Sequence, residues 1–278
     1  MKTKFSLIIT ALSVLMLSCS SKNDEPGPGP DPEPQGKVLF LDNFDSFNSQ
    51  NWTAETHERG WVNHELQSYS PTNVTTGKDG DRTVLKITAK RKGSTFVSGR
   101  VNSKGKVKMN KGILEACIKL PSTANGLWPA FWMMGDNNKE WPACGEIDIM
   151  EMGAKVGIDG KAQDRMLNCA VHYGENAAKH EQQWATVSFN KSLQDGQYHI
   201  YKLVRDDKSL QIFIDDTKVT TFNLDEIPGT YLQGEFYILL NLAVGGDFTG
   251  ILDASGITAI QDEGSAEMCV DWIRITEL

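Results

Sequence analysis

The sequence predicts an all-β fold, a β-jelly-roll sandwich of two antiparallel sheets that share one core. Gly, Asn and Asp separate short apolar runs, and within each run apolar and polar residues alternate, which is typical of antiparallel strands. No segment keeps a 3.6-residue period for more than about three turns. A hairpin is expected around Asp215–Thr217, and Val270–Leu278 is expected to be the last strand. The clearest alternating runs are Thr83–Lys90, Ile113–Leu120, His199–Asp206 and Leu210–Asp216.

The chain is expected to begin with an export signal. Two lysines precede the apolar run Phe5–Leu17, which is too short to cross a bilayer. Because the small residue Ser18 directly precedes Cys19, residues 1–18 resemble a bacterial lipoprotein signal peptide, after which Cys19 would carry the lipid. An ordinary secretory signal with an incidental cysteine is the alternative.

Residues 19–36 are expected to form a spacer between the membrane and the folded domain. The stretch SSKNDEPGPGPDPEPQG contains no core-forming residue, and its prolines keep the backbone extended. The acidic residues after Cys19 resemble the export signal of surface-exposed lipoproteins in some Gram-negative bacteria. We therefore expect a protein that is lipid-anchored to the bacterial outer membrane and exposed at the cell surface.

Residues 37–278 are expected to form one folded domain, because this stretch is long enough for a sizeable core and no second linker interrupts it. The formal net charge is −8. No Lys/Arg stripe offsets this acid excess, so nucleic acid is not an expected partner. A neutral, polar ligand suits this composition better.

The cysteines of this domain give no zinc signature, since none belongs to a CxxC pair and their spacings are wide. An exported domain permits oxidation, but a domain of this size does not need disulfides. Buried thiols and disulfides therefore both remain open for Cys117, Cys144, Cys169 and Cys269.

The six residues EIDIME, Glu146 to Glu151, hold three carboxylates separated by Ile and Met. In a regular strand Glu146 and Asp148 share a face, whereas Glu151 points to the other one. One inserted residue, a β-bulge at Ile149 or Met150, would bring Glu151 onto the face of the other two acids. The apolar residues would then fill the core.

With this bulge the motif suits the chemistry of a glycosidic bond. Glu146 and Glu151 would lie on the order of 13 Å apart between Cα atoms, at roughly 3.3 Å per residue. Side chains inclined toward each other would approach the carboxyl gap of roughly 5–5.5 Å that retaining glycosidases need. Asp148 between them would raise the proton affinity of its neighbours and share a proton. A solvated strand face or a cation site of three carboxylates is the alternative.

Aromatic residues cluster directly before the acids, in GLWPAFWMMG and EWPACG. Flat apolar rings stack on the apolar faces of pyranose rings, so rings beside acids predict a carbohydrate site. Packing in the core explains about half of these rings equally well.

The ordered motifs are similar to those of glycoside hydrolase family 16, in the laminarinase-like branch of endo-β-glucanases. The resemblance covers nearly all of residues 38–278. It implies a jelly roll with a sugar-binding cleft across the concave sheet, and a double displacement with net retention. The motifs are WVNHELQSYSPTNV from Trp61, SGRVNSKGK from Ser98, GLWPAFWMMG from Gly126, GEIDIMEMG from Gly145, HYG from His172, NLAVGG from Asn241 and VDWIRI from Val270.

The resemblance assigns roles to the three acids. It implies that Glu146 is the nucleophile that forms the glycosyl-enzyme. Glu151 would protonate the leaving oxygen and later activate water, while Asp148 would assist both by holding a proton.

The resemblance also implies sugar-binding roles for six further residues. Three would be stacking platforms, namely Trp128, Trp132 and Trp141. Three would hydrogen-bond sugar hydroxyls or orient Glu151, namely Asn63, Arg100 and His172. Each of the last three also has a structural alternative, which is a turn cap for Asn63, an ion pair for Arg100 and a satisfied strand histidine for His172.

Many family members bind a structural calcium on the convex face, and the resemblance places one ligand at Asp271. The N-terminal counterpart is usually DEF, whereas this chain has DNF at Asp42–Phe44. With Asn43 in place of the glutamate, the site would depend on backbone oxygens. The chemistry itself is expected to need no cofactor.

We therefore expect a monomeric, retaining endo-β-glucanase that hydrolyses β-1,3-linked glucans such as laminarin, with mixed-linkage β-1,3/1,4-glucan second. Agarases and carrageenases share the acid motif, but sulfated substrates would favour more cationic cleft residues than this sequence offers. A surface glycan-binding lipoprotein without activity is the alternative from another class. Pure binding would not require three adjacent acids, which repel one another.

Overall fold

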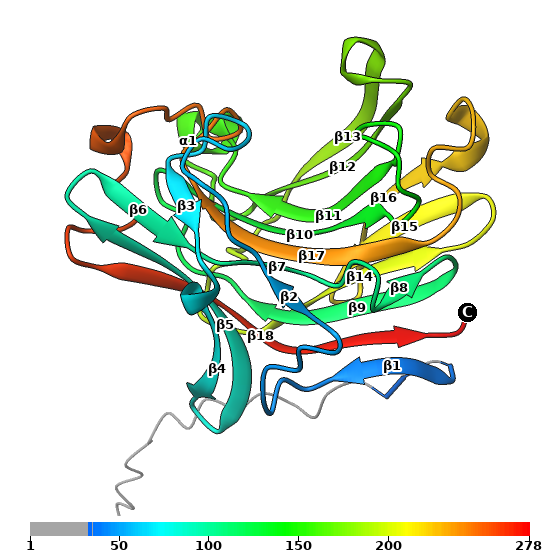
Figure 1. The fold of residues 1–278 in the computed structure, drawn as a ribbon, viewed down its shortest axis with the longest axis horizontal. Helices are drawn as coiled ribbons and strands as arrows, with labels where there is room; N and C mark the ends of the chain where they lie inside the picture. The colour runs from blue at the N-terminus through cyan, green and yellow to red at the C-terminus, as the bar shows by residue number, and fades with distance from the viewer. Residues whose placement is uncertain (1–32, 35) are drawn as a thin grey trace, which may run out of the picture. The chain divides into compact units, whose positions relative to one another are not determined.

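The computed structural model describes residues 33, 34 and 36–278 (Figure 1). The predicted signal peptide at residues 1–18, the predicted lipidation site Cys19 and most of the linker lie outside the described residues. Residues 34–278 form one compact unit. Among the described residues, no helix is both long enough and apolar enough to span a membrane.

The all-β prediction is confirmed, because strands of two sheets make up most of this unit (Figure 1). One sheet has ten strands in the order β16-β15-β14-β9-β18-β5-β6-β3, with β1 paired to β18 and β4 paired to β5. Its strands are β1 (Val38–Asp42), β3 (Gln67–Tyr69), β4 (Val74–Asp79), β5 (Arg82–Lys92), β6 (Thr95–Ser98), β9 (Gly112–Lys119), β14 (His199–Arg205), β15 (Ser209–Ile214), β16 (Thr217–Asn223) and β18 (Ser265–Thr276).

The other sheet has eight strands in the order β13-β12-β11-β10-β17-β7-β2, with β8 paired to β17. Across both sheets the named strands pair in antiparallel fashion, except for β3 and β6, which are parallel. The strands of the eight-stranded sheet are β2 (Thr53–Ala54), β7 (Arg100–Asn102), β8 (Lys108–Met109), β10 (Leu127–Gly135), β11 (Glu146–Met152), β12 (Met166–Gly174), β13 (His180–Ser188) and β17 (Phe236–Val244).

Helical structure in the described part of the chain is limited to connections. These are α1 (Lys155–Asp159), η1 (Pro71–Asn73), η2 (Ala177–Lys179), η3 (Leu224–Glu226) and η4 (Ala254–Gly256).

The core lies between the two sheets, as the alternation of side chains predicts. Leu114 and Ile118 of β9 meet Phe131 of β10 and Ile147 of β11 in one buried apolar cluster. The opposite face of β10 and β17 is also partly closed, since Trp132 and its neighbours form a second, small buried cluster. The eight-stranded sheet is therefore packed on its inner face and carries large side chains on its outer face.

The predicted hairpin and last strand are both present, with one difference. β15 ends at Ile214 and β16 begins at Thr217, so the turn lies where it was predicted. The last strand begins at Ser265 rather than Val270, because Ser265–Val270 pair with β5 before the strand continues along β9.

All four cysteines of the domain are buried. Cys144, Cys169 and Cys269 are free thiols, so a disulfide framework does not hold these strands together.

Candidate active site

β11 contains the bulge predicted within the three-acid motif. Against β10, Asp148 pairs with Trp132 and Met150 pairs with Phe131, which leaves Ile149 as the extra residue. The pairing of β11 with β12 shifts in the same region. An inserted residue at this position restores the alternation of side chains. The predicted bulge is therefore confirmed.

The bulge places the acids of the motif in a cleft and its apolar residues in the core. The three acids line the same cavity, whereas Ile147, Ile149, Met150 and Met152 are buried between the sheets. The Sγ atom of Cys169 donates a hydrogen bond to the carbonyl oxygen of Ile149 at 3.2 Å. This thiol supports the bulge, since a buried carbonyl without a partner is costly.

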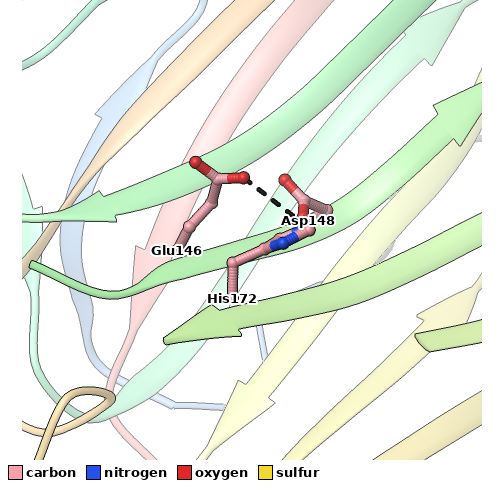
Figure 2. Close-up of side chains that lie close together, drawn as sticks. All are labelled: Glu146, Asp148 and His172. Carbon is pink, nitrogen blue, oxygen red and sulfur yellow. Dashed lines mark ion pairs between the residues drawn. The ribbon is translucent and has the colours of Figure 1, made fainter. Parts of the chain in front are cut away.

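Glu146 is held by two rings at the floor of the cleft. The indole Nε1 of Trp141 donates to Glu146 Oε2 at 3.1 Å, and His172 Nε2 lies 3.8 Å from Oε1 (Figure 2). Burial, reinforced by the neighbouring Asp148 carboxylate, raises the pKa of Glu146 to about 8. Burial therefore opposes the ionisation of Glu146.

Asp148 is the most enclosed of the three acids, with 4% of its surface exposed. His172 Nε2 lies 3.2 Å from Asp148 Oδ2, within ion-pair distance, but no directed hydrogen bond reaches this oxygen (Figure 2). Burial raises the pKa of Asp148, so a proton on this carboxyl is favoured.

Glu151 lies on the far side of the bulge and accepts a hydrogen bond from Trp128 Nε1 at 3.0 Å. Burial raises the pKa of Glu151, and the charge of Asp148 acts in the same direction. Three carboxyls at such close range cannot all ionise, so at neutral pH at least one of them keeps a proton. A protonated acid beside an ionised one is what acid-assisted bond cleavage requires.

His172 is oriented by a second histidine that the sequence analysis did not single out. His172 Nδ1 lies 2.9 Å from Nε2 of His180, so one of the two rings donates a proton to the other. The Trp141 ring lies against both imidazoles, with its centroid 4.7 Å from that of His180. His180 could not be predicted from sequence, because its contact with His172 depends on the pairing of β12 with β13.

Arg100 pairs with an acid, as the structural alternative for this residue predicted, and it also lines the cleft. Its Nε donates to Glu55 Oε2 at 3.0 Å. Its guanidinium lies 4.8 Å from the ring centroid of Trp132 and 5.2 Å from that of Trp61. Trp61 stacks in turn on His57 at 3.4 Å. Arg100 therefore holds two rings of the cleft wall in place.

The three predicted tryptophan platforms differ in exposure. Trp141 is 39% exposed, whereas Trp132 is 9% exposed and donates from Nε1 to Asn241 Oδ1 at 2.8 Å. Trp128 stacks on Phe248 with 4.6 Å between centroids. Trp141 therefore offers the most open ring face, and Trp132 forms part of the wall.

Asn63 lies in a loop with a left-handed backbone, at a φ of 52°. Its Nδ2 donates to Glu65 Oε1 at 3.3 Å, and both residues line the cleft. Glu65 is buried and also accepts a hydrogen bond from Tyr69. Burial raises the pKa of Glu65. Glu65 belongs to the motif that begins at Trp61, but its sequence context predicted no role for this acid.

Two adjoining cavities form one cleft over the outer face of the eight-stranded sheet. The first, of about 430 Å³, lies toward β10, β17 and β7 and contains Arg100 and Trp132. The second, of about 460 Å³, lies toward β12 and β13 and contains His172 and Trp184. Both include Asn63, Trp128, Trp141 and the three acids. All nine residues predicted for catalysis or sugar binding thus line one cleft.

A resident cation does not fit the centre of this cleft. Glu146, Asp148 and His172 offer ligand atoms within 4.8 Å of one another. A cation would need all of them deprotonated, whereas burial favours protonated carboxyls here.

The convex face does not fit a calcium site at Asp271 either. The carboxylate of Asp271 forms an ion pair with the guanidinium of Arg82, which already supplies a positive charge. The carboxylate of Asp42 accepts hydrogen bonds from the side chains of Asn51 and Trp52. Calcium at Asp271 remains a prediction that these contacts do not support.

Known proteins resemble this chain in both sequence and fold. Residues 63–273 match the family model described as glycosyl hydrolases family 16. A solved Bacteroides ovatus family 16 structure, from a mixed linkage glucan PUL and in complex with a product, is 52% identical, with a TM-score of 0.84. The alignment covers 86% of this chain and 100% of that one.

Curated relatives are more distant. The glucan endo-1,3-beta-glucosidase of Cryptopygus antarcticus is 31% identical over 76% of this chain and 82% of its own length. The glucan endo-1,3-beta-glucosidase A1 of Niallia circulans is 29% identical over 78% of this chain. The alignment spans 33% of that protein's length.

Proposed function

Because the chain belongs to glycosyl hydrolase family 16, we propose that it is a retaining endo-β-glucanase whose catalytic acids are Glu146, Asp148 and Glu151. Membership makes it a glycoside hydrolase, and its relatives support endo-acting cleavage of β-glucans. The observation that carries the catalytic assignment is the bulge at Ile149, which brings the three acids onto one face of a cleft.

In the first step the Glu146 carboxylate attacks the anomeric carbon and forms an ester bond to the sugar. Glu151 donates its proton to the glycosidic oxygen as the bond from the anomeric carbon breaks, and the leaving sugar departs as an alcohol. Trp128 Nε1 then donates a hydrogen bond to a carboxylate on Glu151, which stabilises the negative charge that this step leaves behind.

In the second step the Glu151 carboxylate takes a proton from water, and the resulting hydroxide-like oxygen attacks the anomeric carbon. The ester bond to Glu146 breaks and its carboxylate is restored, so the sugar keeps its original configuration. A proton on Asp148 lowers the repulsion between the acids. His172 faces both carboxyls through its Nε2 atom.

We propose mixed-linkage β-1,3/1,4-glucan as the preferred substrate, with laminarin second. The sequence alone favoured the opposite order. The 52% identity over the full length of the Bacteroides ovatus chain is the observation behind this order, since the curated endo-1,3-β-glucosidases are near 30% identical.

The test is product analysis after residues 34–278 are incubated with mixed-linkage glucan, laminarin and agarose in parallel. Oligosaccharides released fastest from mixed-linkage glucan support the proposal, and faster release from laminarin would reverse the order of substrates. No product from either glucan would contradict a glucanase. Proton NMR of the first product tests retention, because a newly formed α-anomer would exclude the double displacement.

We also propose that the protein is exported and anchored through a lipid on Cys19. Replacing this cysteine with serine should move the protein from the membrane fraction to the soluble fraction, and an unchanged distribution would contradict the anchor. We further propose that the protein acts as a monomer.

A further inference from the structure

The edge strand β13 presents a row of side chains to the second cavity. β13 is the last strand of the eight-stranded sheet, next to β12 (Figure 1). Alternate side chains of a strand share a face, and four alternate residues of β13 line this cavity, namely His180, Gln182, Trp184 and Thr186. The cleft therefore continues beyond the three acids to the edge of the sheet.

The strand register aligns this row with the acids. Asp148 pairs with Ala170 of β12, and Ala170 pairs with Trp184 of β13. Glu151 pairs in the same way through Asn168 with the next residue of the row. Since neighbouring strands lie about 4.8 Å apart, the backbone of Trp184 is roughly 10 Å from that of Asp148. A sugar that extends across the strands from the acids would reach this tryptophan.

Trp184 is unusually open for an indole, with 66% of its surface exposed. Edge strands more often carry charged residues, which prevent pairing with other chains. Ala170, between this tryptophan and the acids, is small and 94% buried, so its methyl group forms a flat floor. The indole thus has open space on the side that faces the acids.

The groups around this floor suit a neutral, hydroxyl-rich ligand. Thr186 Oγ1 donates to Asn168 Oδ1 at 2.6 Å, which fixes the amide of Asn168 at the wall of the cavity. The Gln182 side chain lines the cavity from the opposite side of the tryptophan. Neither lysine nor arginine is among the residues that line this cavity, so sulfated or carboxylated sugars find no counter-charge.

We propose that Trp184, together with Asn168, Gln182 and Thr186, forms a subsite that stacks and hydrogen-bonds one glucosyl unit of the polymer beyond the sugars at the scissile bond. This inference rests on the proposed glucanase function and extends it. The subsite lies on the opposite side of the acids from Arg100 and makes the enzyme favour long chains over short ones.

The experiment compares residues 34–278 with Trp184→Ala and Trp184→Phe on mixed-linkage glucan and on its oligosaccharides of increasing length. The unmodified protein should show a rise in kcat/KM at the chain length that first reaches Trp184. Trp184→Ala should lose that rise, with kcat/KM on the polymer about tenfold lower, the effect of one lost stacking contact. The phenylalanine variant should recover most of it. Rates on the shortest substrates should be unchanged.

Leu252→Ala is the matched control, because Leu252 is an apolar residue of similar exposure, 57%, that does not line the cavity. Melting temperatures of all variants identify any loss of folding. Equal kcat/KM values for Trp184→Ala and the unmodified protein at every chain length would overturn the subsite and leave the glucanase intact. An unmodified protein without activity on any glucan would overturn the proposed function itself.

Discussion

Replacing Glu146 with glutamine should stop turnover and, at the same time, stabilise the fold at neutral pH. The amide keeps the shape of the side chain and an oxygen that accepts the hydrogen bond from Trp141. It cannot attack an anomeric carbon, so turnover should fall by orders of magnitude while sugar binding is retained.

The stability gain follows from the raised pKa of Glu146, which is about 8 in the fold against 4.5 for an ordinary glutamate. Below pH 4.5 the carboxyl is protonated in both the folded and the unfolded chain, so it has no effect. As the pH rises from 4.5 to 8, the unfolded chain releases this proton first, and the fold becomes progressively less stable. At pH 7 this cost has a ceiling of about 3 kcal/mol, so we expect Glu146→Gln to gain about 1 to 3 kcal/mol.

Urea unfolding of both proteins at pH 4, 5.5, 7 and 8.5 measures this difference. The gap in unfolding free energy should be near zero at pH 4 and should widen with pH. Glu58→Gln, a change at an exposed glutamate outside the cleft, should produce no such trend. A glutamine variant that is no more stable than the unmodified protein at pH 8.5 would refute the claim that burial of Glu146 opposes its ionisation.

Trp128→Phe removes the indole N–H that Glu151 accepts, so the pKa of Glu151 should rise further and the basic limb of the pH profile of kcat/KM should move to higher pH. An unchanged basic limb would mean that a group other than Glu151 determines it. Cys169→Ala removes the hydrogen bond to the bulge carbonyl and should lower the unfolding free energy by about 1 kcal/mol in urea; equal stability would show that the thiol does not support the bulge. Dialysis against EDTA should leave the melting temperature unchanged, because Asp271 is paired with Arg82, whereas a fall that calcium reverses would contradict this reasoning.

The bulge could be predicted because it follows from whether the acids occupy odd or even positions along the strand. Three acids at positions 146, 148 and 151 share a face only if one residue is inserted, and the apolar residues between them need the opposite face. The alternation of apolar and polar residues was also enough to predict the all-β class and the turn at Asp215. Both features depend on residues that are neighbours in the chain.

Contacts between distant segments could not be predicted in this way. Glu55 reaches Arg100 because β2 pairs with β7, and Trp61 approaches Arg100 only in the folded chain. Trp184 is ordinary in sequence and becomes notable because β13 is an edge strand whose register aligns it with Asp148. Strand order across a sheet is a property of the whole fold, and a local pattern does not contain it.

The single extra residue at Ile149 also links the spacing of the acids to the path of the backbone. Point mutations around the acids alter one side chain at a time, and the backbone keeps its phase. Removal of one residue between positions 148 and 151 would give a regular strand in which the three acids still share a face, but without the bulge that lengthens the step from Asp148 to Glu151. In this chain the bulge therefore sets how far Glu151 lies from Glu146 along the strand, whereas the face that the acids share depends on the parity of their spacing.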